Sequence, residues 1–425
     1  MTGTALSCSK PEGDSIESLS INPSFLTFGA KSGSKEVTVF SSANWQVSGG
    51  EPWCEVSLHT GSDGDVVRFT ASANGQPEVR TAKFVFTAGS QSVYFEVRQD
   101  ANRTLAMLDQ LVPLYMEKNN VPAVSLAITY KERLVYLNTF GYQDLDNRVP
   151  ATNDHIFRIA SITKVLTLVG ILKLVEQGKM TVNDKVLGDH GILGFDFGGK
   201  GFGSSFADSR MTDITVDHLI QHKSGWIEPP LDLSKTLDEF ITNAVTNVPL
   251  RYAPGTEFQY SNFDYILLWE IIEKVAQQDY HDFLQQHVFD PIGITQIVKG
   301  SDFSSGRLHK EVNYYDNRMN KVDYVWGAGG AVASAHDLAK LLVHIDRNQA
   351  VYPDILPASL FPPYLLSFGT WIHDGGCPGT TARATRMNDD ICFVMLVNTD
   401  TSLEDLNLFN FLENVTEWPA HDLFK

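Results

Sequence analysis

A serine and a lysine stand three residues apart in Ser161-Ile-Thr-Lys164, and the segment that follows them is apolar on nearly every side. If this segment is a helix, positions i and i+3 share a face, so the amine of Lys164 can reach the hydroxyl of Ser161. A serine becomes a nucleophile when a base takes its proton, and a buried lysine at the positive end of a helix can act as that base. The pair predicts a serine activated by a lysine, although Ser-x-x-Lys alone is common in proteins.

Two further motifs follow the first at intervals of about a hundred residues. Tyr260-Ser261-Asn262 opens a later predicted helix, and His373-Asp374-Gly375-Gly376 ends a strand-like run. Ser-x-x-Lys, Tyr-x-Asn and [Lys/His]-x-Gly in this order resemble the three elements of the serine β-lactamase and penicillin-binding protein superfamily. The framing segments are similar to its class C and esterase-like branch, and they are 214–225, 289–293 and 327–339. The resemblance covers roughly residues 103–400.

The resemblance implies a role for each matching residue. Ser161 would be acylated by a carbonyl substrate, and Lys164 would take its proton. Tyr260 would bridge this pair, pass the proton to the leaving group and later activate water for deacylation. Asn262 would orient Lys164 or a substrate amide.

The same resemblance implies an oxyanion hole and a substrate-binding strand. The hole would consist of the backbone N–H of Ser161, at a helix start, and the backbone N–H of Gly376. His373 would stand at the position of a site lysine, and Gly375 would complete the third motif.

The third motif departs from the Lys-Thr-Gly of β-lactamases and many DD-peptidases. His373 is only partly charged near neutral pH, and Asp374 places an anion where a donor is expected. These changes weaken the anchor for a substrate carboxylate. Two alternatives stay open: Arg383 and Arg386 on the following strand restore anion binding, or Asp374 prefers a substrate ammonium.

The expected function is therefore a serine hydrolase that uses neither metal nor cofactor. We interpret it as a carboxylesterase or a peptidase of the D-aminopeptidase or DD-peptidase type, whose partner is a small-molecule ester, amide or peptide. A β-lactamase is the alternative. A rival from another class is a slowly deacylating penicillin-binding or carbohydrate-binding surface protein without efficient turnover.

Other candidate residues have simpler interpretations. His218 and His222 have metal-like i, i+4 spacing, but Leu219 stands where a zinc protease has its glutamate, so we interpret them as structural. The chain has four cysteines and no C-x-x-C, which disfavours a metal site. Whether Cys377 and Cys392 pair stays open.

Residues 16–99 alternate apolar and polar residues in six or seven short runs between Gly-, Ser- and Asn-rich turns, a pattern typical of an all-β, Ig-like sandwich. The segment resembles the BACON family in 21–28, 41–45 and 52–54, in Arg80 and in 97–99. That resemblance implies a spacer or a carbohydrate-binding module. Trp45 and Trp53 could stack on sugars, but in so small a sandwich a Trp is more often a core residue. Residues 100–104 are then a linker.

Residues 105–425 mix long helical runs with strands and form the predicted hydrolase domain. Strands come first, helices in the middle and strands last, which predicts one α+β domain with an antiparallel sheet, helices on both faces and a helical subdomain. Helices are predicted at 163–176, 234–245, 264–278, 279–288 and 334–346. Strands are predicted at 121–130, 133–140, 364–372, 382–387 and 390–398.

Composition and charge narrow the partners. The chain has 425 residues, 43% of them hydrophobic, and a formal charge of −18, which disfavours nucleic acid and anionic membrane surfaces. It has no apolar run long enough for a transmembrane helix. Residues 1–15 are predicted to be a disordered tail. Cys8 resembles the end of a trimmed lipoprotein signal, which favours the bacterial periplasm or cell surface.

Overall fold

The computed structural model describes residues 17–197, 200–201, 206–230, 235–301, 306–316, 326–360 and 371–425, with the backbone alone for 196–197 and 200–201. The predicted tail 1–15 and Cys8 lie outside these residues. Contacts divide the chain into two compact units. The first holds the chain up to Leu108 together with Asn407–Trp418, and the second holds Asp109–Leu406 and Pro419–Lys425.

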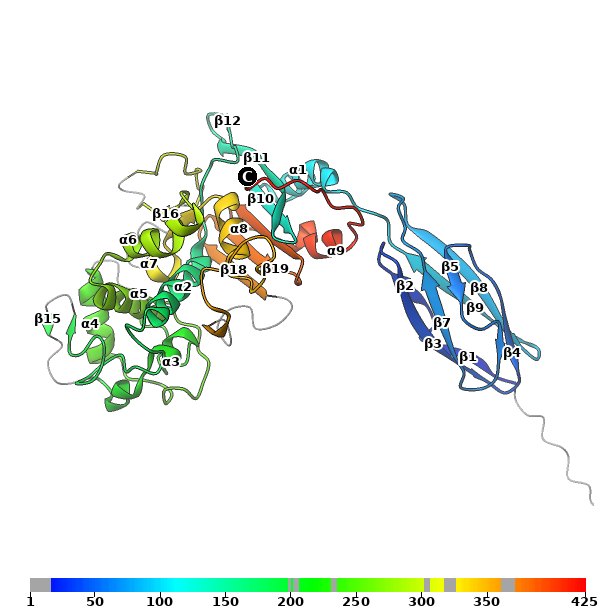
Figure 1. Ribbon diagram of the computed structural model, residues 1–425, viewed down its shortest axis with the longest axis horizontal. Helices are drawn as coiled ribbons and strands as arrows, with labels where there is room; N and C mark the ends of the chain where they lie inside the picture. Colours follow the sequence, from blue (N-terminus) through cyan, green and yellow to red (C-terminus); the bar gives the residue numbers. More distant parts are fainter. Residues whose placement is uncertain are drawn as a thin grey trace, which may run out of the picture. The chain divides into compact units, whose positions relative to one another are not determined.

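The first unit is a β-sandwich, as predicted (Figure 1). One sheet has the order β1 (Leu19–Asn22), β3 (Gly33–Ser41), β7 (Val66–Ala71) and β5 (Cys54–Val56). The other has the order β2 (Leu26–Phe28), β9 (Gln91–Gln99), β8 (Arg80–Ala88), β4 (Trp45–Gly49) and β6 (Thr60–Gly61). Buried and exposed residues alternate along β7, so one face of the sheet meets the shared apolar core.

The side chains of the two tryptophans of this unit both contact other groups of the protein. Trp45 is buried in the sandwich core, and its indole N–H donates to the carbonyl of Ser62 at 2.9 Å. The guanidinium of Arg80 lies 4.4 Å from the ring centroid of Trp53. Trp45 therefore has no face open to a sugar, and Arg80 covers one face of Trp53.

The C-terminal segment 407–418, with helix α9 (Leu408–Glu413), belongs to the first unit, although it lies within the range 105–425 that the sequence assigns to the hydrolase domain. The side-chain oxygen of Asn414 accepts from the buried N–H of Ala30 at 2.6 Å. Its backbone carbonyl accepts from the N–H of Arg103 at 3.0 Å. One buried asparagine thus joins three separate stretches of chain.

The second unit is built on a six-stranded antiparallel sheet. Its order is β12 (Val149–Pro150), β11 (Arg133–Asp144), β10 (Ala123–Tyr130), β20 (Ile391–Val397), β19 (Thr380–Arg386) and β18 (Trp371–Cys377). β10 and β20 pair in the middle and are buried along almost their whole length, so both faces of the sheet are covered. The sheet therefore joins the two ends of the domain, as predicted.

Helices and short strands fill the chain between these ends (Figure 1). Helix α1 (Leu108–Asn119) precedes β10. The described helices between the ends are α2 (Thr163–Glu176), α3 (Val216–Ile220), α4 (Leu237–Asn247), α5 (Asn262–Ala276), α6 (Tyr280–Leu284), α7 (Trp326–Gly329) and α8 (Ala335–Val343). A small sheet has the order β13 (Phe157–Arg158), β17 (Ala331–Ala333) and β16 (Ile297–Lys299), and β14 (Asp196–Phe197) pairs with β15 (Lys200–Gly201).

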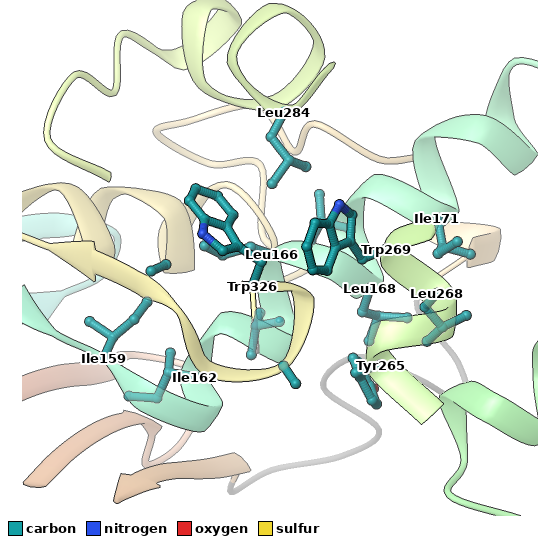
Figure 2. Packing of buried hydrophobic residues seen from close by; sticks show 14 of the residues in the cluster. Ile159, Ile162, Leu166, Leu168, Ile171, Tyr265, Leu268, Trp269, Leu284 and Trp326 are labelled. Atoms are coloured by element: carbon teal, nitrogen blue, oxygen red, sulfur yellow. The ribbon is translucent and has the colours of Figure 1, made fainter. Parts of the chain in front are cut away.

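Helix α2 lies in the apolar core and packs against α5 and α7. Figure 2 shows this packing, to which Trp269 on α5 and Trp326 on α7 contribute their indoles. Their ring centroids are 6.4 Å apart, and the ring planes are tilted by 48°. Gly327 makes the close approach possible, because a Cβ at this position would lie 2.5 Å from the Cβ of Trp269. The packing brings the carbonyl of Ala328 to the side of α2.

The predicted elements differ from the observed ones mainly at their ends. The helix at 163–176 has the predicted bounds. The single helix predicted at 279–288 is instead the short α6 followed by a π-helical turn at Gln285–Phe289, just before a proline at position 291. Most of the strand predicted at 364–372 lies outside the described residues, and β18 is described from Trp371 onward.

Candidate active site

Ser161 lies in the 3₁₀ turn η2 (Ala160–Ile162), directly before α2. Ala160 has a φ of 44°, in the left-handed region that a residue with a side chain rarely adopts. Strain of this kind persists where the surrounding structure holds it, often at functional sites. Here Ile159 and Ala160 are pressed against Gly375 of β18, whose missing Cβ would lie 2.1 Å from the carbonyl oxygen of Ile159.

The side chain of Lys164 is buried and has three polar partners. Its Nζ lies 3.3 Å from Ser161 Oγ, 2.8 Å from Asn262 Oδ1 and 2.6 Å from the carbonyl oxygen of Ala328. The last two are pure acceptors, so they take both N–H groups of a neutral amine. The lone pair of that amine is then left for the hydroxyl of Ser161.

Burial is the main influence on the protonation of Lys164, which is 1% exposed. Loss of solvation lowers the pKa of its amine to about 7, and the carboxylate of Glu228 opposes this by raising it. Near neutral pH the amine is therefore partly unprotonated. A lysine with an ordinary pKa would be almost fully protonated there and unable to act as a base.

Tyr260 contacts the nucleophile directly. Its hydroxyl donates to Ser161 Oγ at 2.7 Å, and its ring lies 4.8 Å from Lys164 Nζ. Burial raises the pKa of the phenol, the hydrogen bond with Ser161 lowers it in part, and the charge of Glu228 raises it again. Tyr260 is therefore a neutral phenol at physiological pH, able to give a proton.

The turn that carries Tyr260 and Asn262 is held by hydrogen bonds to the segment after α3 and to the first turn of α5. Ser261 N–H donates to Nδ1 of His222 at 3.2 Å, and Ser261 Oγ accepts from the N–H of Asp264 at 3.3 Å. Glu228 Oε2 accepts from the N–H of Asn262 at 2.7 Å. Sequence reasoning missed Glu228, and the only local signal was its position three residues after the framing segment 214–225.

The two histidines interpreted as structural have different neighbours. His218 forms a capping box with Thr215 at the start of α3. The ring of His222 lies 4.6 Å from that of Tyr260, beside the site. Burial and the charge of Lys164 lower the pKa of His222 to about 4, so it is neutral and accepts the hydrogen bond from Ser261.

His373 and Gly375 lie on the edge strand of the sheet, and β18 contacts η2. Burial and the charge of Lys164 lower the pKa of His373 to about 4. The expectation of a partly charged His373 was therefore wrong, because that expectation took the imidazole to be solvated. Its Nδ1 lies 3.2 Å from the carbonyl oxygen of Asp374.

Asp374 and Arg383 are not brought to the nucleophile. They pair across β18 and β19, and the guanidinium of Arg383 donates two hydrogen bonds, at 2.7 and 2.8 Å, to the carboxylate of Asp374. Adjacent Gly375 pairs with Ala382, which belongs to the same core as Ile159. Since successive residues of a strand face opposite sides, Asp374 and Arg383 face away from the side that carries Ser161.

The structure therefore supports neither alternative for the third motif, anion binding by Arg383 and Arg386 or ammonium binding by Asp374. Arg383 also donates to Glu404 at 2.7 Å, and Arg386 donates to Asp389 at 2.8 Å. Each guanidinium already has an anionic partner within the protein. Asp374 likewise has its cation.

Cys377 and Cys392 are both free thiols. They lie on β18 and β20, with β19 between them. Two strand spacings come to about 9–10 Å, which exceeds the Cα separation of a disulfide.

Among the described residues no group of three or more His, Cys, Asp or Glu side chains is arranged to hold a metal ion. No described helix is long and apolar enough to cross a membrane.

Comparison with known proteins agrees with this geometry. The family model described as Beta-lactamase matches residues 108–410, and the BACON model, described as "Putative binding domain, N-terminal", matches residues 43–100. The first match covers well over half of the chain. The chain therefore belongs to the β-lactamase family of serine hydrolases and carries an N-terminal BACON domain.

Individual relatives match part of the chain. Protein flp of Staphylococcus aureus (strain MW2) is 30% identical over 225 residues, which are 50% of this chain and 42% of that protein. Penicillin-binding protein 4* of Bacillus subtilis (strain 168) is 26% identical over 307 residues, 60% of this chain and 63% of that protein. The matches thus span less than two thirds of these relatives.

A solved structure shares the fold. The β-lactamase/D-alanine carboxypeptidase from Pseudomonas syringae superposes with a TM-score of 0.59 over 72% of this chain and 98% of its own, at 16% identity. At this identity the likeness concerns the fold alone.

Proposed function

We propose that the second unit forms an acyl-enzyme on Ser161 and releases it with water, as an esterase or as a peptidase of the D-aminopeptidase or DD-peptidase type. The observation that carries this proposal is Lys164, a buried amine with a pKa of about 7 whose Nζ lies 3.3 Å from Ser161 Oγ. A base matched to neutral pH beside a hydroxyl is what nucleophilic catalysis by serine requires.

The reaction then follows from the contacts. Ser161 Oγ attacks the carbonyl carbon of the substrate while its proton moves to Lys164 Nζ. Tyr260 gives its proton to the leaving oxygen or nitrogen as the bond from that atom to the carbonyl carbon breaks, and the proton held by Lys164 restores the phenol. Water attacks the acyl carbonyl with the same groups acting as base, and Ser161 leaves with a proton.

The oxyanion formed during each attack needs fixed donors. We assign this role to the backbone N–H groups of Ser161, at the start of η2, and Gly376, on the edge strand β18. The contact between β18 and η2 supports the assignment, and so does the tight packing of Gly375. Removing one such donor typically costs about 100- to 1,000-fold in rate.

The charges of the third motif favour an ester or amide over a β-lactam. A penicillin or cephalosporin carries a carboxylate that a cationic third motif would hold. Here His373 is neutral near pH 7, and Arg383 is engaged by Asp374 and Glu404. The strand therefore brings no free cation to the nucleophile.

Turnover of a chromogenic p-nitrophenyl ester, a D-amino acid p-nitroanilide and a chromogenic cephalosporin by wild type and Ser161→Ala tests this function. We expect steady hydrolysis of the ester or the anilide, a loss of about 1,000-fold or more in the variant, and slower hydrolysis of the cephalosporin. Full esterase activity in a folded Ser161→Ala protein would sink the assignment. One stoichiometric burst would favour a slowly deacylating penicillin-binding protein.

For the sandwich we propose a glycan contact at a polar cavity, not at its tryptophans. The cavity has a volume of about 430 Å³ and is lined by Glu51, Glu55, His59, Gly49, Gly50, Cys54, Val56 and Phe84. Retention of the intact protein on immobilised glycans is the measurement that bears on this proposal.

We further propose that the protein works in the bacterial periplasm or at the cell surface, with a lipid anchor at Cys8 as the means of attachment.

A further inference from the structure

Glu228 lies in the loop after α3 and is followed by two prolines. Its Oε2 accepts from the N–H of Asn262 at 2.7 Å and from the N–H of Phe263 at 3.3 Å. These are two of the backbone donors that the first turn of α5 cannot satisfy within the helix. Pro229 limits the backbone of Glu228 to extended conformations, so the carboxylate is held by a stiff segment.

Glu228, which caps the start of α5, is linked through Asn262 to the groups that transfer the proton. Asn262, whose N–H Glu228 binds, uses its side-chain oxygen to accept from Lys164 at 2.8 Å. Tyr260, two residues before Asn262, donates to Ser161 at 2.7 Å. A displacement of this turn would move Asn262 relative to Lys164 and Tyr260 relative to Ser161.

We propose that Glu228 is a positioning residue for the general base: its carboxylate holds the Tyr260–Asn262 turn against Lys164, and its negative charge favours the protonated amine. The inference rests on the proposed function, because it assumes that Lys164 takes the proton of Ser161. It adds a residue outside the three motifs to the catalytic apparatus.

The charge of Glu228 matters because the described histidines and tyrosines around Lys164 are neutral near pH 7. The described groups that face Lys164 or couple to its charge are Ser161 of η2, Tyr260, Asn262 and Tyr265 at and before α5, Ala328 O of α7, His222 after α3, His373 of β18 and Glu228. Burial holds both histidines neutral. Burial also raises the pKa of the nearby Asp264 well above its usual range, which disfavours the charged form of that carboxyl.

The charge of Glu228 changes the pKa of Lys164 in one direction. A negative charge favours the protonated amine, so Glu228 raises the pKa of Lys164 against the lowering by burial. Removing the charge lowers this pKa, and the base is then unprotonated at lower pH. The acid limb of the rate profile should move toward lower pH, whereas loss of a merely structural cap would reduce the rate without moving the limb.

The test compares Glu228→Gln, Glu228→Ala and the control Glu257→Gln, which removes an exposed carboxylate three residues before Tyr260. Glutamine keeps an oxygen acceptor for the two N–H groups but loses the charge. The readouts are kcat/KM for the ester and the rate of Ser161 labelling by a fluorophosphonate, each from pH 5.5 to about 9. Labelling reports on the activation of Ser161 even if the wild type hydrolyses no ester, so failure of the proposed hydrolysis is seen separately.

We expect the ratio of the labelling rate at pH 6 to that at pH 8 to rise about twofold or more in Glu228→Gln, and this change to shrink at about 1 M salt because Glu228 is exposed. Glu228→Ala should lose about tenfold or more in rate at every pH, since small displacements of catalytic groups are costly. Glu257→Gln should follow wild type. Acid limbs that coincide in Glu228→Gln and wild type would overturn the electrostatic role, and an unchanged rate in Glu228→Ala would overturn the positioning role.

Discussion

The sandwich core and the catalytic centre treat buried polar groups in opposite ways. The sandwich buries apolar and aromatic side chains, and its buried Gln99 donates to backbone carbonyls and accepts from Arg80. The catalytic centre buries the amine of Lys164 and leaves Ala160 in a left-handed conformation. In the catalytic centre these features, which cost stability, lower the pKa of a base and aim a nucleophile. The contrast predicts that activity and stability can be changed independently.

The largest effect should come from replacing Lys164 by methionine, which has a similar length and no charge. We expect acylation of Ser161 to fall by about 1,000-fold or more, because Tyr260, the other described side chain bonded to the hydroxyl, is a neutral phenol that cannot take its proton near neutral pH. Stability should respond differently. Folding lowers the pKa of Lys164 from 10.5 to about 7, so the unfolded chain binds more protons between these values, and wild type gains stability relative to the variant as pH rises from 7 to about 9.

Melting temperatures of both proteins at three pH values between 7 and about 9 measure this change. Two parallel curves would show that burial does not shift the amine. The comparison between the two cores would then lose its main support.

A smaller effect should separate two adjacent glycines of β18. A Cβ on Gly375 would lie 2.1 Å from the carbonyl oxygen of Ile159, whereas nothing lies within 4 Å of a Cβ on Gly376. Gly375→Ala must push β18 away from η2, so we expect a loss of about 100-fold or more in kcat/KM, similar to the loss of an oxyanion donor. Gly376→Ala should stay within about threefold of wild type. Equal activity of the two variants in the ester assay would refute this account of the strand.

The three motifs could be predicted from sequence because each is local. Ser161 and Lys164 are one helical turn apart, and Tyr260 and Asn262 flank a helix start, so spacing sets the geometry within each motif. The predicted helix 163–176 has the observed bounds for the same reason. The strands predicted at 121–130 and 390–398 likewise correspond to the buried β10 and β20. The resemblance to a known family implied that the motifs meet in one site.

The remaining features of the site depend on tertiary contacts. Ala328 contributes a backbone carbonyl, which cannot be predicted from the residue type. Glu228 binds the start of α5, although the two are 34 positions apart in sequence. The direction of Asp374 depends on its register with Arg383, and that register needs the whole sheet. Burial of His373 likewise depends on neighbours from other elements, so its charge could not be judged from its residue type.

The smallest effect on catalysis should come from the first unit. Asn414→Ala removes the acceptor for the buried N–H of Ala30, now bound at 2.6 Å, and an unsatisfied buried donor costs about 1–3 kcal/mol. Urea unfolding should show this loss, while kcat per folded molecule stays within about twofold of wild type. The exposed neighbour Asn410 supplies the control, because Asn410→Ala keeps the backbone carbonyl to which Asn414 donates. A fall in kcat for Asn414→Ala alone, at full folding, would show that the sandwich unit influences the chemistry at Ser161 and that the two regions are not independent.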